Sequence, residues 1–261
     1  MHRSNHTCPY VPLPSSFSLV HRSSIIAFSI AQQLAKSVNY VHAFNFVHKH
    51  VRPESVLIWD ATETKLPSIF PVGFDTFRSA DGGTNFVGDA QWAANIYRHP
   101  SRQVERLVES YKMQHAIYSL GVCLLEVGLW APLVRYERRN GAEPQPGAVF
   151  DDYVKENASA IPPSRDISNM LLSGEPLKSY LVGLAKTELP SLAGDKYAEI
   201  VVTCLTCLDQ ENNGFGDESE MVDEDEILVG VRFIEAILLR LNEIAVIITV
   251  PHTEISVHPG E

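Results

Sequence analysis

The chain has 261 residues, of which 45% are hydrophobic and 20% are charged, and its formal net charge is −11. These values are typical of a soluble globular protein with one sizeable core or two smaller ones. The acidic balance argues against nucleic acid or an anionic membrane as a general partner, because both bind basic surfaces. We therefore expect protein partners, whose identity the composition does not specify.

Three of the four cysteines lie in apolar segments, where a free thiol behaves as a small hydrophobe: Cys123, Cys204 and Cys207. This usage indicates a reducing compartment, and we expect a cytoplasmic location. No apolar run follows the basic residue near the N-terminus, so the sequence shows no signal peptide. The longest nearly apolar run, residues 120–134, contains Glu126 and is too short to span a membrane.

Several prolines and serines in residues 1–20 predict an irregular lead-in. Apolar residues then recur at helical spacing, which predicts an amphipathic helix over residues 24–42. The composition of residues 56–59 predicts a short strand. Residues 65–71 are expected to form a turn and the partner of that strand.

The apolar residues that end at Leu129 predict a helix that begins near His115 and is buried on most sides. Residues 135–167 are rich in proline, glycine and charge, and we interpret them as a long surface insertion. Residues 245–250 form a short apolar stretch, and residues 251–261 are expected to be a frayed tail. Helical patterns occur in three further segments: 169–180, 197–208 and 227–244.

The segment from Phe46 to Trp59 reads F-V-H-K-H-V-R-P-E-S-V-L-I-W. It resembles the catalytic loop of eukaryotic protein kinases, H-R-D-L-K-P-E-N followed by a short apolar strand. The framework of that motif is kept here, while its Asp and Asn are replaced. The residues that correspond to the eight motif positions are His48, Lys49, His50, Val51, Arg52, Pro53, Glu54 and Ser55.

A second segment resembles the D-F-G motif that follows the catalytic loop in this family. Here the order is reversed, with Gly73 in the place of the Asp, then Phe74, then Asp75 in the place of the Gly. The polar, glycine-containing segment 76–95 has the character of an activation loop.

Two more segments follow in the order that the family has. Tyr97 to Ser101, Y-R-H-P-S, resembles Y-x-A-P-E, with Ser101 replacing the Glu whose ion pair anchors the activation loop. The residues from His115 to Val122 resemble D-I-Y-S-L-G-V at the start of the buried central helix. Ala116 replaces the Asp that supports the catalytic loop in the family.

The replaced residues imply weakened phosphoryl transfer. In the family the loop Asp accepts the proton of the substrate hydroxyl, while the loop Asn and the D-F-G Asp hold metal ions. His50 carries no fixed negative charge, and the hydroxyl of Ser55 is a weaker metal ligand than an amide carbonyl. Gly73 offers no side chain. Because residues two apart in an extended segment face the same side, Asp75 is the remaining candidate metal ligand.

The resemblance covers residues 21–250 and only the large, C-terminal lobe of a kinase. Ahead of the first helix the chain shows neither a glycine-rich phosphate loop nor a strand Lys. The implied fold is mainly α (α+β), a kinase-like large lobe without the small lobe. The residues found at the motif positions are similar to those of divergent kinase-like domains of filamentous fungi.

These residues predict a pseudokinase, a kinase-like domain that acts as a signalling or regulatory binding module and needs no cofactor. The joint loss at His50, Ser55, Gly73 and Ala116 removes the groups that would stabilise a transferring phosphoryl group. The alternative is an ATP-dependent protein kinase with rearranged chemistry. It would use Asp75 to hold magnesium, with a small lobe lost from this chain or supplied by another.

A third interpretation is a calcium-responsive interaction protein. Residues 209–220 fit part of an EF-hand loop, with candidate ligands at Asp209, Glu211, Asn213, Asp217 and Glu220. Position three is Glu rather than Asp or Asn, and the sequence contains no second hand. An acidic solvated loop between two helices is therefore the preferred interpretation.

Two other patterns could indicate a metal or redox site. Cys204 and Cys207 form a C-x-x-C pair, but no second pair is present and the neighbours are apolar, so we expect core packing. His48 and His50 lie two residues apart and could be ligands. The family histidine instead ties the loop to the adjacent segment, and we expect that role for His48.

Overall fold

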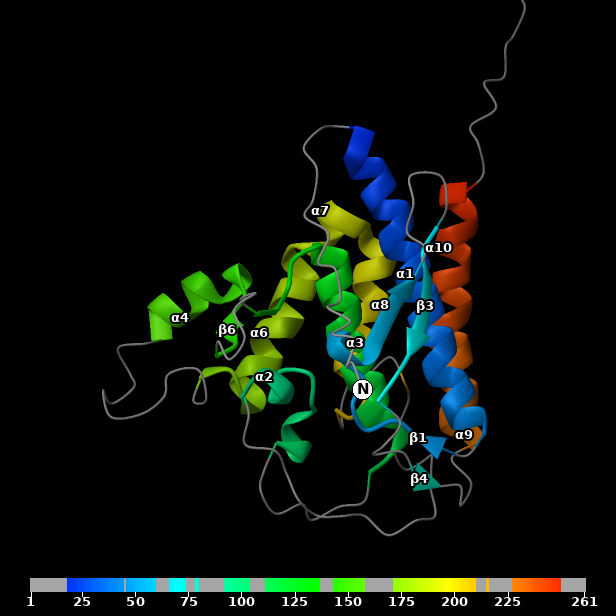
Figure 1. Ribbon diagram of the computed structural model, residues 1–261, viewed down its shortest axis with the longest axis horizontal. Coiled ribbons are helices and arrows are strands. Elements are labelled where there is room, and N and C mark those ends of the chain that lie inside the picture. The colour runs from blue at the N-terminus through cyan, green and yellow to red at the C-terminus, as the bar shows by residue number, and fades with distance from the viewer. Residues whose placement is uncertain are drawn as a thin grey trace, which may run out of the picture.

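The computed structural model is mainly helical (Figure 1). It describes residues 18–44, 46–59, 66–73, 78–79, 92–103, 111–136, 143–157, 171–209, 215 and 227–249. Its α-helices are α1 (Ser18–Ala43), α2 (Trp92–Asn95), α3 (Met113–Leu129), α4 (Asp151–Asn157), α6 (Gly174–Thr187), α7 (Leu189–Ala193), α8 (Asp195–Leu205), α9 (Ile227–Phe233) and α10 (Arg240–Thr249). Its strands are β1 (Phe46–Val47), β2 (Val56–Trp59), β3 (Ser68–Pro71), β4 (Arg78–Ser79), β5 (Val134–Arg135) and β6 (Gln145–Pro146).

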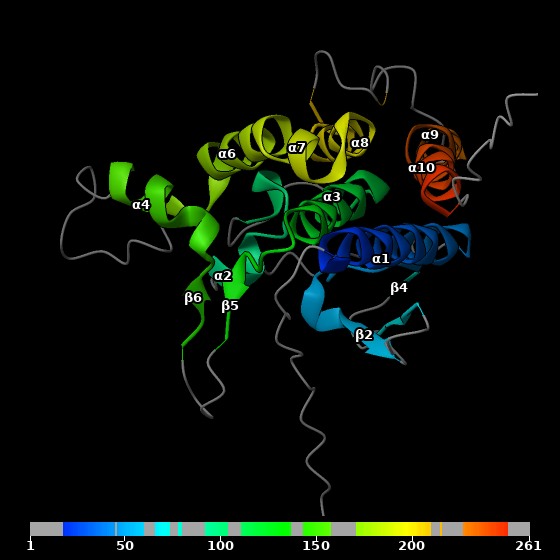
Figure 2. The same ribbon diagram turned by 90° about the horizontal axis from the view of Figure 1, so that it is seen from above.

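Helix α3 is the centre of the molecule, as its apolar sequence predicts. Its residues from Met113 to Leu125 are buried, with α1 packed on one side and α8 on the other (Figure 2). The contact with α8 is close because Gly121 has no side chain, and a Cβ there would lie 2.6 Å from the Cβ of Cys204. Tyr197 of α8 donates a hydrogen bond of 2.8 Å to the carbonyl of Leu124. The predicted buried helix is therefore confirmed.

Helix α1 confirms the predicted amphipathic helix and extends it at its N-terminal end. Ala31 and Ala35 are fully buried. Small side chains at these positions let neighbouring elements approach the helix closely. Figure 2 shows α1 between α3 and the hairpin of β2 and β3. This arrangement places the segment from Phe46 to Trp59 directly over α1.

The strands pair in three small antiparallel sheets among the described residues. β2 pairs with β3 as predicted, with Leu57 opposite Phe70 and Ile58 opposite Ile69. β1 pairs with β4, which brings Phe46 opposite Ser79. The loop between β1 and β2 is thus held at both ends by strand pairs.

The C-terminal segment is a continuous helical rod along α1, formed by α9, a π-helical segment (Ile234–Leu239) and α10. Residues 245–249 belong to α10, so the expected end of the helix near residue 244 is wrong. The side chain of Gln32 in α1 donates to Asn242 in α10. Arg240 also pairs with Glu199 of α8. These contacts fix the first turn of α10 against two neighbouring helices.

The predicted surface insertion contains ordered elements. β5 pairs with β6, and Phe150, in a short 3₁₀ turn before α4, is fully buried. A Cβ at Gly147 would lie 2.0 Å from the carbonyl oxygen of Pro132, so this hairpin packs too tightly for any side chain there. The helices predicted at 169–180 and 197–208 are found as α6 and α8, displaced by a few residues.

Candidate functional site

The candidate site is the loop between β1 and β2, residues 48–55. Its first residue, His48, is buried. The backbone N–H of His50 donates to Nδ1 of His48 over 3.2 Å, so the ring carries its proton on Nε2. Nε2 then donates to the carbonyl of Val72 over 3.0 Å. Both ring nitrogens are occupied, and the loop is tied to the segment that precedes Gly73.

Ser55, at the position of the metal-binding Asn in the kinase motif, points into the loop. Its Oγ accepts the N–H of Arg52 at 3.2 Å. The same Oγ lies 2.5 Å from the carbonyl oxygen of His50 and 2.8 Å from that of Arg52, so its single proton is shared between them. The side chain is buried. The hydroxyl therefore closes the loop on itself instead of facing a ligand.

The outer side of the loop carries charge. Arg52 and Glu54 form an ion pair of 3.6 Å, with both side chains about one third exposed, 31% and 34%. The hydroxyl of Tyr136, 82 residues further along the sequence, donates a hydrogen bond to Glu54. Burial, and then this carboxylate, raise the pKa of Tyr136. Glu54 is therefore engaged by two neighbours at the rim of the site.

The reversed D-F-G segment is described only at its first residue. Gly73 has a φ of 83°, in the left-handed region that an Asp rarely adopts. A Cβ there would lie 3.8 Å from the Cβ of Ser55, so the segment passes directly beside the loop. Phe74 and Asp75 lie outside the described residues, as does most of the segment 76–95.

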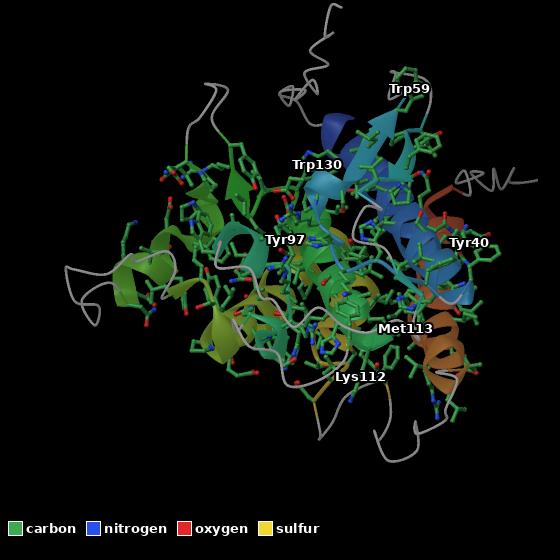
Figure 3. The ribbon with its side chains drawn as sticks, turned by 60° about the horizontal axis from the view of Figure 1, so that its bottom comes forward. Tyr40, Trp59, Tyr97, Lys112, Met113 and Trp130 are labelled. Atoms are coloured by element: carbon green, nitrogen blue, oxygen red, sulfur yellow. The ribbon has the colours of Figure 1, made fainter. Side chains whose placement is uncertain are left out.

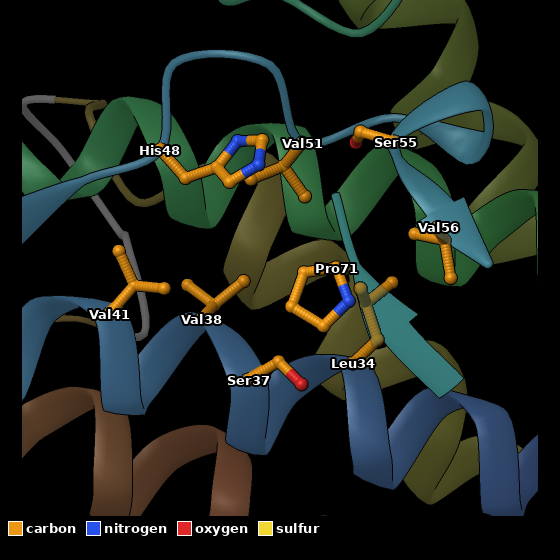
Figure 4. Close-up of a pocket in the computed structure, with 9 residues that line it drawn as sticks. All are labelled: Leu34, Ser37, Val38, Val41, His48, Val51, Ser55, Val56 and Pro71. Atoms are coloured by element: carbon orange, nitrogen blue, oxygen red, sulfur yellow. The ribbon is translucent and has the colours of Figure 1, made fainter. Parts of the chain in front are cut away.

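A small cavity of about 20 Å³ lies beneath the loop (Figure 4). Its surface is almost entirely apolar, and it has room for an object no larger than one water molecule. A nucleotide does not fit in it. The lining residues come from α1, the loop and the two strands: Leu34, Ser37, Val38, Val41, His48, Val51, Ser55, Val56 and Pro71.

Ser101 stands at the position where kinases have a Glu that anchors the activation loop. Here Ser101 forms hydrogen bonds with two histidines instead. Nδ1 of His115 accepts the N–H of Lys112 at 2.9 Å, so its Nε2 carries the proton and donates to Oγ of Ser101 over 3.3 Å. The hydroxyl of Ser101 lies 2.9 Å from Nδ1 of His99 and donates to it. Burial lowers the pKa of His99 to about 4 and that of His115 to about 3. Both rings are therefore neutral, and they tie residues 99–101 to α3.

Ala116 has no polar side chain that could bond to the loop, as the Asp of the kinase family does. A nearby aromatic residue contacts the loop here. Ala116 is fully buried. Tyr111, just before α3, lies with its hydroxyl 3.5 Å from the carbonyl of His48. Arg102 stacks over the Tyr111 ring at 5.4 Å from its centroid. In the described part of the chain, Tyr111 therefore contacts the backbone of the loop, and Arg102 packs on the ring of Tyr111.

The sequence did not single out a partly buried carboxyl group of α3 as a residue of interest. Glu126 of α3 accepts a hydrogen bond of 2.6 Å from the hydroxyl of Tyr97. Burial raises its pKa to about 7, and Glu54 adds to the rise, while the bonds from Tyr97 and the backbone of Leu133 oppose it. The only sequence signal was a single acidic residue inside an apolar run.

The calcium interpretation can be examined only at its first ligand position. Asp209 forms an ion pair with Lys178 of α6, whose side chain is only 8% exposed. The pair occupies a carboxylate oxygen that a calcium ion would need. Glu211, Asn213, Asp217 and Glu220 lie outside the described residues, while Phe215 in the same segment is fully buried.

The cysteine pair is packed in the core, as predicted. Cys204 and Cys207 are buried, and burial raises the pKa of each thiol. Sγ of Cys207 donates to the carbonyl of Gln114 over 3.3 Å. In the described part of the chain, no three His, Cys, Asp or Glu side chains lie together as a metal site requires.

None of the described helices is both long enough and apolar enough to cross a membrane. In comparisons with known proteins, no family model and no solved structure matches the chain. A serine/threonine-protein kinase-like protein of Arabidopsis thaliana is 28% identical over 124 residues, which cover 45% of this chain. The chain spans only 34% of the length of that relative. The similarity is weak and points to a distant kinase-like relationship.

Proposed function

We propose that this chain is a degenerate kinase-like large lobe that binds a partner protein in signalling and does not transfer phosphate. The observation that carries the proposal is the inward-facing hydroxyl of Ser55, which bonds to the loop's own carbonyls. A group engaged in this way is not directed at a metal ion. The hydroxyl instead bonds within the loop.

The histidine ties support the same function. His48 holds the loop against Val72, and His99 and His115 hold residues 99–101 against α3. Phosphoryl transfer depends on charged groups and metal ions that offset the charge of the transferring group. Neutral histidines maintain the scaffold without supplying that charge. A binding module needs only the scaffold.

The finer assignments belong to the same proposal. We assign the chain to the divergent, fungal type of kinase-like domain and to the cytoplasm. The three cysteines among the described residues are free and buried, which supports a reducing compartment. The distant plant relative supports the kinase-like part of the assignment alone.

The test is thermal unfolding of the purified chain with and without magnesium-ATP. A ligand that binds only the folded form must raise the melting temperature. Because we expect the chain not to bind magnesium-ATP, we expect its melting temperature to stay the same. A phosphotransfer assay on a general substrate should give no more product than a His50→Ala variant. A clear shift, or transfer that His50→Ala or Asp75→Ala abolishes, would contradict the proposal and favour the rearranged kinase.

A further inference from the structure

Two polar groups in the contact between α3 and residues 99–101 have no hydrogen-bond partner among the described residues. They are Nε2 of His99 and the hydroxyl of Tyr118, and both atoms are buried. His99 is 9% exposed and Tyr118 is fully buried, and their rings pack edge to face with centroids 5.1 Å apart. Because unpaired buried polar groups are destabilising and rare in native proteins, these two groups point to a bound molecule.

The proton of the His99 ring lies on Nε2. Nδ1 accepts the backbone N–H of Ser101 at 3.3 Å and the hydroxyl of the same residue at 2.9 Å. Burial, followed by the charge of Lys178, lowers the pKa of His99 to about 4, so the ring is neutral at pH 7 and has a single proton. Nε2 is therefore a donor, and the hydroxyl of Tyr118 can donate as well. A molecule that satisfies both groups must accept hydrogen bonds.

An ion pair lies close to both groups. Lys178 of α6 binds the carboxylate of Asp209, which follows α8, and Glu175 lies 3.8 Å from the same ammonium. The carboxylate of Asp209 raises the pKa of His99 against the effects of burial and Lys178. Burial raises the pKa of Tyr118, and the carboxylates of Glu175 and Asp209 add to the rise. Asp209 is therefore within electrostatic reach of both unpaired groups.

We propose that a single water molecule binds between His99 and Tyr118 and bridges them to Asp209. Its oxygen accepts from Nε2 of His99 and from the hydroxyl of Tyr118, and one of its protons goes to the carboxylate of Asp209. Three hydrogen bonds are typical of a buried water. An anion is disfavoured because Asp209 and Glu175 would repel it. A metal ion is disfavoured because Nε2 is protonated and Lys178 already neutralises Asp209.

The water links parts of the fold that are distant in the chain. α6 packs against α3 and against the 3₁₀ turn Pro100–Arg102, so the site lies among elements from separate regions of the sequence. Residues 99–101 are already tied to α3 through His115. The water extends this network from His99 to the segment that follows α8. The position of residues 99–101 therefore depends on the water as well as on the histidines.

Tyr118→Phe tests the bridge by equilibrium urea unfolding. Removing the hydroxyl leaves the water with one partner fewer, so we expect the ratio of folded to unfolded protein to fall about five- to tenfold. An unpaired hydroxyl predicts the opposite, because its removal ends the burial of a polar atom without the loss of a bond. Tyr40→Phe is the matched control, since Tyr40 is 62% exposed and lies on the opposite side of the molecule from α6 (Figure 3). It should leave the ratio unchanged.

A crystal structure that resolves ordered waters tests the occupant directly. We expect water density about 2.7 to 3.2 Å from both Nε2 of His99 and the hydroxyl of Tyr118. In solution, the nitrogen chemical shifts should show His99 as the tautomer with its proton on Nε2. That proton should show cross-relaxation with water in the NMR spectrum. In the Tyr118→Phe variant the water should be less ordered or absent.

Three results would each overturn the proposal. A Tyr118→Phe variant as stable as the unsubstituted chain would show that the hydroxyl has no partner. A loss of stability without water in the crystal structure would mean that the hydroxyl bonds directly to the protein. A His99 proton that packs only on the Tyr118 ring would show no contact with water and would not respond to Tyr118→Phe. None of these measurements involves magnesium-ATP, so the water site and the proposed function can fail separately.

Discussion

At the scale of single residues, the loop from His48 to Ser55 is held together by neutral side chains. His48 uses both ring nitrogens to hold backbone groups, and Ser55 uses its hydroxyl in the same way. Among the described residues, Glu126 has a raised carboxyl pKa and accepts a hydrogen bond from Tyr97. Its protonation gives the first prediction.

Replacing Glu126 with Gln should stabilise the protein above pH 7. The folded pKa of about 7 lies above the unfolded value of 4.5, so stability is complete below pH 4.5 and is lost as pH rises through 7. A neutral Gln does not incur this loss and can still accept from Tyr97. At pH 8 we expect a gain of about 1 to 2 kcal/mol in urea unfolding, shrinking toward zero near pH 5.

The matched control for that prediction is Glu243→Gln, on the exposed side of α10. It should leave the free energy of unfolding nearly unchanged at both pH values. If Glu126→Gln were less stable than the unsubstituted chain at pH 8, the assignment of a raised pKa to Glu126 would be wrong.

Replacing Asp209 with Asn should destabilise the protein by roughly 2 kcal/mol, because it leaves the buried ammonium of Lys178 with Glu175 alone, 3.8 Å away. The double variant with Lys178→Met should recover most of the loss, because both charges are then removed. Equilibrium urea unfolding measures all three forms. Calcium should not change the melting temperature of the unsubstituted chain, and a calcium shift that Asp209→Asn removes would restore the EF-hand interpretation.

At the scale of elements, the packing of α3 against α8 depends on a residue that has no side chain. A Cβ at Gly121 would meet the Cβ of Cys204 at 2.6 Å and the N of Leu205 at 3.2 Å. Apolar spacing predicts both helices well because it depends on local sequence. The distance between them depends on Gly121 and Cys204 together, and no local pattern indicates it.

Gly121→Ala should therefore destabilise the protein by about 2 to 3 kcal/mol, because α3 and α8 must move apart to accept the methyl group. Gly183→Ala in α6 is the control, since a Cβ there meets nothing within 4 Å. It should stabilise the protein by up to about 1 kcal/mol through helix propensity alone. Urea unfolding of both variants checks the contrast, and equal effects in the same direction would contradict it.

At the scale of the whole molecule, three histidines whose pKa values are lowered link stability to pH. Burial lowers the pKa of His42 and His99 to about 4 and that of His115 to about 3. Lys178 lowers that of His99 further while Asp209 opposes it, and Arg102 adds to the lowering at His115. In the unfolded chain these three histidines bind protons near pH 6.5, whereas in the folded chain His42 and His99 bind them near pH 4 and His115 near pH 3.

The free energy of unfolding should fall as pH decreases from 6.5 toward 4, by up to about 1.4 kcal/mol per pH unit for each histidine. Glu126 becomes protonated in the same interval and opposes the loss, so the measurement belongs in the Glu126→Gln background. Urea unfolding at pH 7, 6 and 5 gives the slope. A His115→Gln substitution should reduce that slope, and a flat profile in the parent would show that the histidines are solvated.

The sequence by itself determined the positions of the main helices, the β2 and β3 pair and the order of the kinase-like segments, because these depend on the spacing of nearby residues. It also indicated where these segments differ from the kinase motifs that they resemble. Only the tertiary structure decided that Ser55 turns inward, that Glu126 lies beside Tyr97 and that α10 continues to Thr249. The position of Glu126 depends on a partner 29 residues away in the chain, and the orientation of Ser55 depends on how the loop folds back on its own carbonyls, which no spacing of residue types indicates.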